Sequence, residues 1–149
     1  LNYDEDFVIM AAEEEMDEIT RKLMRIGLDR IAGFISDVNL PGIELQKADV
    51  LGIEEFKTYL GKEDVQIVDV RGKTEFDAGH VEGAENVFVG TLQQNLDKIS
   101  KDKQVVIHCQ SGDRSAIAYS VLRKNGFNNV KNYSGGMKEW GEKGNPVIN

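Results

Sequence analysis

The residues with the clearest chemical potential surround Cys109, the only cysteine of the chain. Cys109 lies between the β-branched run Val105–His108 and a stretch with helical spacing that starts near Arg114. Gly112 can adopt the backbone angles of a tight loop, so successive N–H groups can point inward as an anion-binding nest at a helix N-terminus. A thiol in such a place loses its proton easily. We therefore expect Cys109 to act as a nucleophile rather than as a small buried hydrophobe.

The loop after Cys109 supplies the rest of the predicted site. The residues expected to hold an anion or a bound sulfur atom are Gln110, Ser111, Gly112, Asp113, Arg114 and Ser115. Arg114 either binds the charged end of a substrate or braces the loop through a carboxylate, for which Asp69 is available. Bracing is favoured, because a guanidinium pairs with a carboxylate in a fixed bidentate geometry. Arg71 either extends the positive field over the mouth of the site or forms a surface ion pair with Glu75.

The histidines and glycines near these motifs have structural interpretations. His80 and His108 are far apart in the sequence and have no second thiol nearby, so they predict neither a general base nor a metal site. Gly135 and Gly136 precede another helical segment, and we expect them to allow a close approach to the Cys109 loop.

Short β-branched runs alternate with helical patterns along the chain. The predicted strands are Phe7–Met10, Gln66–Val70, Val87–Val89, Gln104–His108 and Val130–Tyr133. The predicted helices are Met16–Ile26, Ile53–Leu60, Leu92–Ile99, Arg114–Asn125 and Gly136–Gly141. Strands separated by helices need crossover connections, which predicts an α/β fold with a mostly parallel sheet. Ligands of such sheets bind beyond the carboxyl ends of the strands, where Cys109 lies.

An internal repeat predicts how the chain is divided. The segment that begins at Phe7 resembles the segment that begins at Val105, and Ala11 stands where the second copy has Cys109. We therefore expect a strand-loop-helix-strand remnant of a degenerate domain over residues 1–36, a linker over residues 37–47 and an active domain over residues 48–149. Because the first residues are already strand-like and the chain does not start with methionine, we expect it to be part of a longer protein.

Composition argues against several partner classes. The hydrophobic fraction of 40% and the charged fraction of 30% are ordinary for a soluble globular protein. There is no run of about 18 apolar residues, so no association with a membrane is predicted. The net charge is −8 and no basic stripe is present, so nucleic acid is not an expected partner. A lone cysteine suits a reducing compartment, and we expect the protein in the cytoplasm.

Four ordered motifs carry a family resemblance. The loop pattern C-x-x-G-x-R-S, with "IVDVR" at Ile67–Arg71, "EFDAGHVEGAENV" at Glu75–Val87 and "GGMKEW" at Gly135–Trp140, resembles a rhodanese domain over residues 48–149. The resemblance implies a rhodanese-like fold with a mostly parallel five-stranded sheet flanked by helices. It also implies a sulfurtransferase in which Cys109 takes sulfane sulfur from thiosulfate or a persulfide. The resulting Cys109 persulfide needs an external acceptor, such as sulfite, cyanide or a thiol, because no second cysteine is present.

Two other functions fit parts of the sequence. Dual-specificity phosphatases related to this fold use a C-x5-R loop, whereas here Arg114 is five positions after Cys109. The shorter loop favours sulfane sulfur over phosphate. Rhodanese-like domains without a working cysteine serve as binding or regulatory modules, a description that residues 1–36 fit and residues 48–149 do not.

The order of the two copies resembles a known kind of fusion protein. In those fusions a metallo-β-lactamase-like persulfide dioxygenase precedes the rhodanese domains, which implies a covalently attached upstream domain that binds iron. Within these 149 residues we expect no cofactor. The expected partners are small anionic sulfur donors and thiol or sulfite acceptors.

Overall fold

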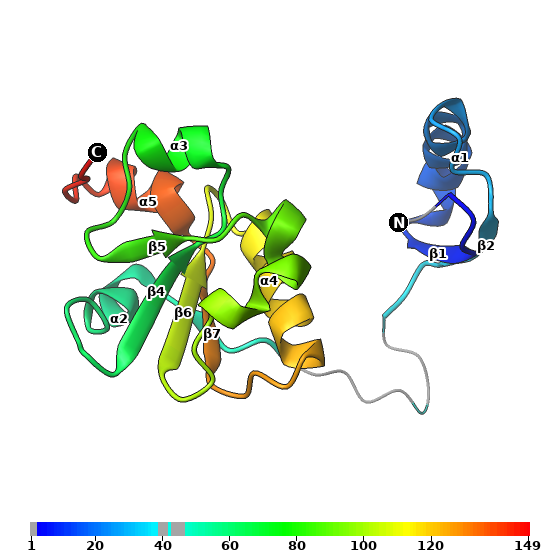
Figure 1. Cartoon of the computed structure of the whole chain (residues 1–149). Helices are drawn as coiled ribbons and strands as arrows, with labels where there is room; N and C mark the ends of the chain where they lie inside the picture. Colours follow the sequence, from blue (N-terminus) through cyan, green and yellow to red (C-terminus); the bar gives the residue numbers. More distant parts are fainter. Residues whose placement is uncertain (1–2, 39–41, 43–46) are drawn as a thin grey trace. The chain divides into compact units, whose positions relative to one another are not determined.

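The chain forms two compact units, each with its own sheet. The computed structural model describes residues 3–38, 42 and 47–149. Unit 1 comprises Leu1–Gln46 and unit 2 comprises Lys47–Asn149 (Figure 1). The predicted linker, residues 37–47, lies mostly outside the described residues.

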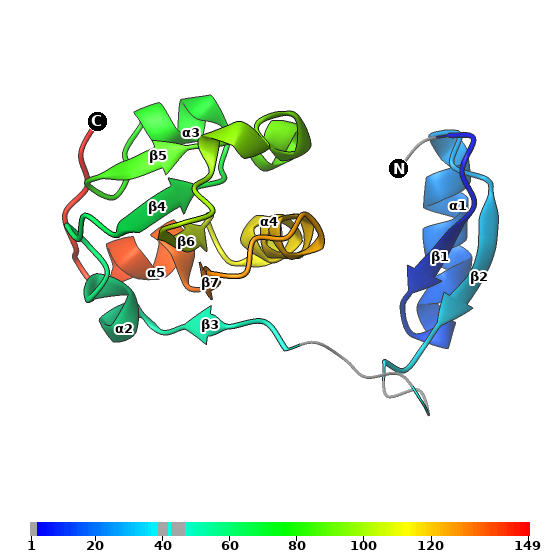
Figure 2. The same ribbon diagram turned by 60° about the horizontal axis from the view of Figure 1, so that its bottom comes forward.

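Unit 1 is a single strand-helix-strand element. Its elements are β1 (Phe7–Met10), a 3-10 turn (Glu13–Glu15), α1 (Met16–Arg25) and β2 (Ile31–Ile35). The two strands pair in parallel, and α1 lies against one of their faces (Figure 2). Burial alternates along β1, where Val8 and Met10 are 55% and 67% exposed on the other face. None of the described residues of unit 1 is fully buried.

Unit 2 confirms the predicted α/β fold with a five-stranded sheet. Its strands are β3 (Val50–Leu51), β4 (Val65–Asp69), β5 (Ala84–Asn86), β6 (Gln104–His108) and β7 (Val130–Tyr133). They lie in the order β3-β7-β6-β4-β5, and every neighbouring pair is parallel. Because β6 is the central strand, Cys109 follows it at the middle of the carboxyl edge of the sheet.

Helices cover both faces of the unit 2 sheet. They are α2 (Ile53–Lys57), α3 (Lys73–Asp77), α4 (Asp113–Lys124) and α5 (Gly136–Glu142), with 3-10 segments at Val89–Gln94 and Leu96–Lys98. The core on one face packs against α4 and the 3-10 segments, and the core on the other packs against α2 and α5 (Figure 1). On the second face, Phe56 stacks on Tyr133 with ring centroids 4.3 Å apart and meets Trp140 edge-on at 5.7 Å.

The position of β5 differs from the predicted strand by three residues. The pattern of Val87 and Val89 predicts a strand there, but the paired strand is Ala84–Asn86. Beyond that strand, the N–H of Val87 still donates to the Asp69 carbonyl at 3.0 Å, and the N–H of Val89 to the Val70 carbonyl at 3.1 Å. Val87 and Val89 therefore lie just after β5 and still bond to the β4 segment. Their apolar character marks the residues that continue β5, not the residues that begin it.

The sequence pattern did not predict the short elements β3 and α3. β3 has two residues and α3 has five, so neither is long enough to show a period. The predicted helix Leu92–Ile99 is instead split into 3-10 segments at Asn95, whose φ of −124° is outside the helical range.

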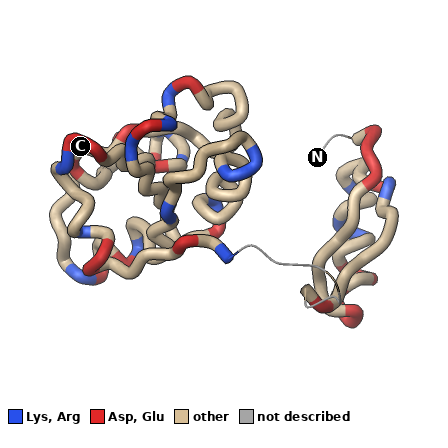
Figure 3. Tube along the Cα trace, turned by 90° about the horizontal axis from the view of Figure 1, so that it is seen from below, with Lys and Arg blue, Asp and Glu red and all other residues tan. Residues whose placement is uncertain are grey.

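The helices and the charged residues bear on the surroundings that the chain suits. No helix in the described part of the chain is long and apolar enough to cross a membrane. Along the trace of unit 2, Lys and Arg residues are interspersed with Asp and Glu residues (Figure 3).

Candidate active site

The loop that carries Cys109 turns sharply at Gly112. It connects the end of β6 at His108 to the start of α4 at Asp113, one residue before the predicted helix start. Gly112 has a φ of 101°, and a Cβ there would lie 2.8 Å from the Ser134 carbonyl oxygen. Glycine is therefore required at this position both for the backbone angle and for space.

The thiol of Cys109 faces hydrogen-bond donors of its own loop. The N–H of Gly112 donates to Sγ at 3.1 Å, and the residue is only 1% exposed. Burial raises the pKa of the thiol, but the Ser115 hydroxyl and the N–H groups of Ser115, Ser111 and Gly112 together outweigh burial and lower it. The loop is thus arranged to stabilise a negative charge on sulfur.

The other side chains of the loop play different parts. Ser115 is fully buried, and its hydroxyl lies 2.9 Å from the Gly112 carbonyl oxygen; its single proton can turn from that carbonyl to the Cys109 sulfur when the thiol is ionised. Gln110 is half-buried, whereas Ser111 and Asp113 are exposed. Ser111 lowers the pKa of Cys109 through its backbone N–H.

The start of α5 holds the carbonyl groups of the loop. The N–H of Met137 donates to the Cys109 carbonyl at 2.9 Å, and the N–H of Lys138 to the Gln110 carbonyl at 3.0 Å. A Cβ on Gly136 would lie 2.4 Å from the Cys109 carbonyl oxygen. The close approach predicted for this glycine is therefore present. It allows the N–H groups at the start of α5 to bind the carbonyl groups of the loop.

Arg114 braces the loop through Glu75 rather than through Asp69. Its two terminal nitrogens donate to the two carboxylate oxygens of Glu75 at 2.6 and 2.8 Å. The pKa of Glu75 falls to about 2, with the Arg114 hydrogen bond as the largest cause, and the carboxylate also accepts the N–H of Gly72 at 3.2 Å. The structure thus agrees with the favoured bracing role, but the predicted partner was wrong.

Asp69 and Arg71 form the second, buried ion pair. Arg71 donates through Nε and Nη2 to the Asp69 carboxylate at 2.7 to 3.0 Å and through Nη2 to the Gly79 carbonyl at 2.8 Å. Its side chain is 5% exposed, so it neither spreads a positive field over the mouth nor pairs with Glu75. The physical reason is local: two residues after the end of β4, Arg71 turns back onto the nearest carboxylate. The pair supports the junction of β4 and α3.

Neither histidine contacts the thiol. His108 is fully buried, burial lowers its pKa, and its Nε2 has no hydrogen-bond partner. His80 stacks on Phe76 at 3.7 Å, and its backbone pairs with Ile148. Among residues 3–38, 42 and 47–149, no group of three or more His, Cys, Asp or Glu side chains is placed to hold a metal ion.

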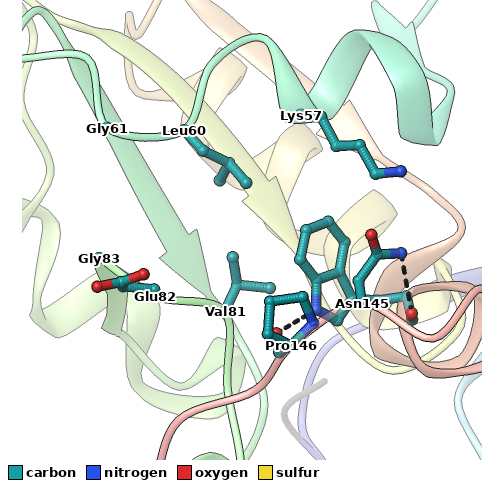
Figure 4. A pocket seen from close by; sticks show the side chains of 9 residues that line it. Lys57, Leu60, Gly61, Val81, Glu82, Gly83, Asn145 and Pro146 are labelled. Carbon is teal, nitrogen blue, oxygen red and sulfur yellow. Dashed lines mark hydrogen bonds between the residues drawn. The ribbon is translucent and has the colours of Figure 1, made fainter.

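A hollow of about 480 Å³ lies at the other end of the sheet (Figure 4). Leu60, Val81, Trp140 and Pro146 give it an apolar wall. Leu60 lies in the loop before β4, whereas Cys109 follows the carboxyl end of β6. The hollow has no cysteine among its lining residues and is separate from the thiol site.

Comparisons with known proteins bear on this arrangement. The family described as the Rhodanese-like domain matches residues 52–143, which is more than half of the chain. The chain belongs to the rhodanese family. The uncharacterized protein YqhL of Bacillus subtilis is 42% identical over 90 residues, which cover 60% of this chain and 70% of that protein.

Two further relatives of this rhodanese carry functional names. A protein of Allochromatium vinosum named "Sulfurtransferase" is 35% identical over 86 residues, covering 58% of this chain and 80% of its own. The structure of the human single-domain sulfurtransferase TSTD1 matches with a TM-score of 0.57 and 30% identity, covering 65% of this chain and 98% of that one. The rhodanese resemblance read from the four motifs is confirmed.

Glu75 is the residue near the site that sequence reasoning assigned to the wrong partner. The sequence offers it as a partner for Arg71, and no spacing rule connects it to Arg114, which is 39 positions away. The N–H groups of Met137 and Lys138 were not predicted at all, because backbone donors leave no mark in the sequence. The only sequence signal for this contact was the expectation that Gly135 and Gly136 allow a close approach to the Cys109 loop.

Proposed function

We propose that this chain is a sulfurtransferase that carries sulfane sulfur as a persulfide on Cys109. The observation that carries the proposal is the geometry of the loop: the Gly112 N–H donates to the buried Cys109 sulfur at 3.1 Å, and the neighbouring N–H and hydroxyl groups lower the pKa of the thiol. Those donors stabilise the thiolate that attacks and the persulfide anion that results. The names of the two sulfurtransferase relatives support the same chemistry.

The proposed cycle has two displacement steps. In the first, the Cys109 thiolate attacks the outer sulfur of the donor, a new S–S bond forms, and the donor's own S–S bond breaks. Sulfite leaves from thiosulfate, or a thiolate leaves from a persulfide, with the bonding electron pair. In the second, the acceptor attacks the outer sulfur of the Cys109 persulfide and the thiolate is regenerated. Sulfite, cyanide and thiols are suitable acceptors, and neither step needs a metal or an external oxidant.

The first prediction concerns the nucleophile. C109S should abolish sulfur loading and leave the fold unchanged, because serine fills the same space without a thiol. Intact-mass measurement after incubation with thiosulfate or a small persulfide should show the gain of one sulfur atom by the wild type and no gain by C109S. Circular dichroism provides the control for folding.

The outcome separates the proposal from its alternatives. A non-catalytic binding module would gain no sulfur from either donor in its wild-type form. Sulfur transfer by C109S at the wild-type rate would refute the proposed role of Cys109.

The cellular setting is part of the same proposal. A single thiol that must stay reduced between turnovers suits the cytoplasm. The internal repeat supports attachment to an upstream metallo-β-lactamase-like persulfide dioxygenase, whose sulfite product would serve as an acceptor. Iron would belong to that upstream domain.

A further inference from the structure

The arginines near the Cys109 loop are each matched by a carboxylate. Arg114 is paired with Glu75 through two hydrogen bonds, and Arg71 is paired with Asp69 in a buried ion pair. These four side chains together contribute no net charge. The thiol is therefore stabilised chiefly by neutral donors, namely N–H groups and one hydroxyl.

The Arg114–Glu75 pair is open to an incoming donor, unlike the buried pair. The side chain of Arg114 is 33% exposed and that of Glu75 is 41% exposed. The pKa of Arg114 is raised chiefly by its hydrogen bond to Glu75, and also by the negative charge of the nearby Cys109 thiolate. The pKa of Glu75 is about 2, so its carboxylate stays ionised throughout the neutral range. It therefore cancels the charge of the Arg114 guanidinium beside the Cys109 loop.

Other charges near the loop leave the balance close to neutral. Asp113 is exposed in the first turn of α4, Lys138 is exposed in α5, and Glu139 lies beside it in the first turn of α5. These three side chains carry two negative charges and one positive charge. Thiosulfate carries two negative charges and must approach a thiolate, so its approach depends on a net positive charge that these side chains do not supply. The reacting end of a thiol persulfide carries at most one negative charge and meets a smaller barrier.

Resting on the proposed sulfur transfer, we propose that Glu75 sets the donor class of this site: by cancelling the charge of Arg114, it selects sulfane sulfur carried on a thiol over dianionic thiosulfate. Cys109 attacks the outer sulfur of the persulfide R–S–SH, the S–S bond of the donor breaks, and R–S⁻ leaves and takes up a proton from solvent. Glu75 acts through Arg114 and is a specificity-determining residue rather than a catalytic one.

The test is E75Q, which removes the charge and keeps both the size of the side chain and an acceptor for the Gly72 N–H. Cys109 loading is followed by intact mass with thiosulfate and with the persulfide of 2-mercaptoethanol, which is otherwise uncharged. Wild type should load faster from the persulfide. In E75Q the thiosulfate rate should rise severalfold, up to about tenfold, and fall more steeply with added salt, as expected for an uncovered cation. The persulfide rate should change by less than about twofold on the same argument.

Two further variants separate charge from bracing. D77N makes the same change in net charge on α3 at a carboxylate paired with Lys73, and it should not alter the ratio of the two rates. R114Q leaves Glu75 unpaired and should move the ratio in the direction opposite to E75Q, while the double variant E75Q/R114Q should return it toward the wild-type value.

The possible failures are distinguishable. If E75Q, R114Q and the double variant lower both rates by equal factors, the pair only braces the loop and the inference is wrong. The inference is also wrong if the wild type prefers thiosulfate. If neither donor loads wild-type Cys109, the proposed function itself fails.

Discussion

At the scale of single residues, hydrogen bonds from the loop are the main influences that lower the pKa of Cys109. Burial alone would raise the pKa of the thiol, and the Ser115 hydroxyl is the largest influence that lowers it. A hydrogen bond to a charged group contributes about 1.5–3 kcal/mol. Losing one such bond therefore raises the pKa of the thiol.

The lowered pKa of the thiol predicts how the reactivity of Cys109 changes with pH. The thiolate is the reacting form, so a lowered pKa keeps Cys109 reactive at lower pH, and reactivity is lost as the pH falls through the pKa of the folded protein. S115A should raise that pKa and shift the whole profile of alkylation by iodoacetamide to higher pH. S120A is the matched control, because Ser120 lies on the same helix with its hydroxyl bonded to the Ala116 carbonyl. An S115A profile identical to wild type would mean that Ser115 does not act on the thiol.

At the scale of elements, the loop depends on the first residue of α5. Gly136 has a φ of 58°, and a Cβ there would meet the Cys109 and Gln110 carbonyl oxygens at 2.4 and 2.7 Å. The substitution G136A therefore adds a steric clash to the cost of the backbone angle. Because backbone atoms cause the clash, the loop or α5 must move.

G136A should accordingly reduce stability by about 2–4 kcal/mol and slow sulfur loading strongly. G144A is the control: Gly144 has a similar φ of 68°, but no atom lies within 4 Å of the added Cβ. It should lose only the cost of the angle, about 1 kcal/mol, and keep wild-type loading. Thermal unfolding and intact mass measure the two effects. Equal losses in both variants would show that the contact between α5 and the loop is unimportant.

At the scale of the whole molecule, the buried core belongs to unit 2. Every buried hydrophobic residue among those described lies between Leu51 and Trp140. The proposed site, from Glu75 to Lys138, lies entirely within unit 2 as well. Unit 1 keeps the strand-helix-strand order of the repeat, but Ala11 occupies the position that corresponds to Cys109.

We therefore predict that residues 47–149 fold and load sulfur without unit 1. The truncated protein should keep its unfolding midpoint for the main transition and its loading rate within about twofold, because every contact of Cys109 described above is made within unit 2. Circular dichroism and intact mass are the measurements. A truncated protein that folds but does not load Cys109 would place part of the site in residues 1–46 and refute the division.

The sequence by itself determined the parts of this protein that depend on neighbouring residues. The strands Gln104–His108 and Val130–Tyr133 have the predicted bounds, and α4 begins within one residue of its predicted start. Strand alternation, helical spacing and a glycine in a tight loop all act within a few positions, so the place of Cys109 at the carboxyl edge could be read directly.

Only the tertiary structure decided which charges meet. Glu75 and Asp69 are both acidic and both precede the loop, and the sequence contains no measure of which one Arg114 reaches. The answer depends on how the end of β4 turns: Arg71 folds back onto Asp69, and α3 then presents Glu75 to Arg114. The contact between Gly136 and the Cys109 carbonyl has the same origin. Ion-pair partners and close backbone approaches depend on distances between segments far apart in the chain, and local residue patterns do not encode those distances.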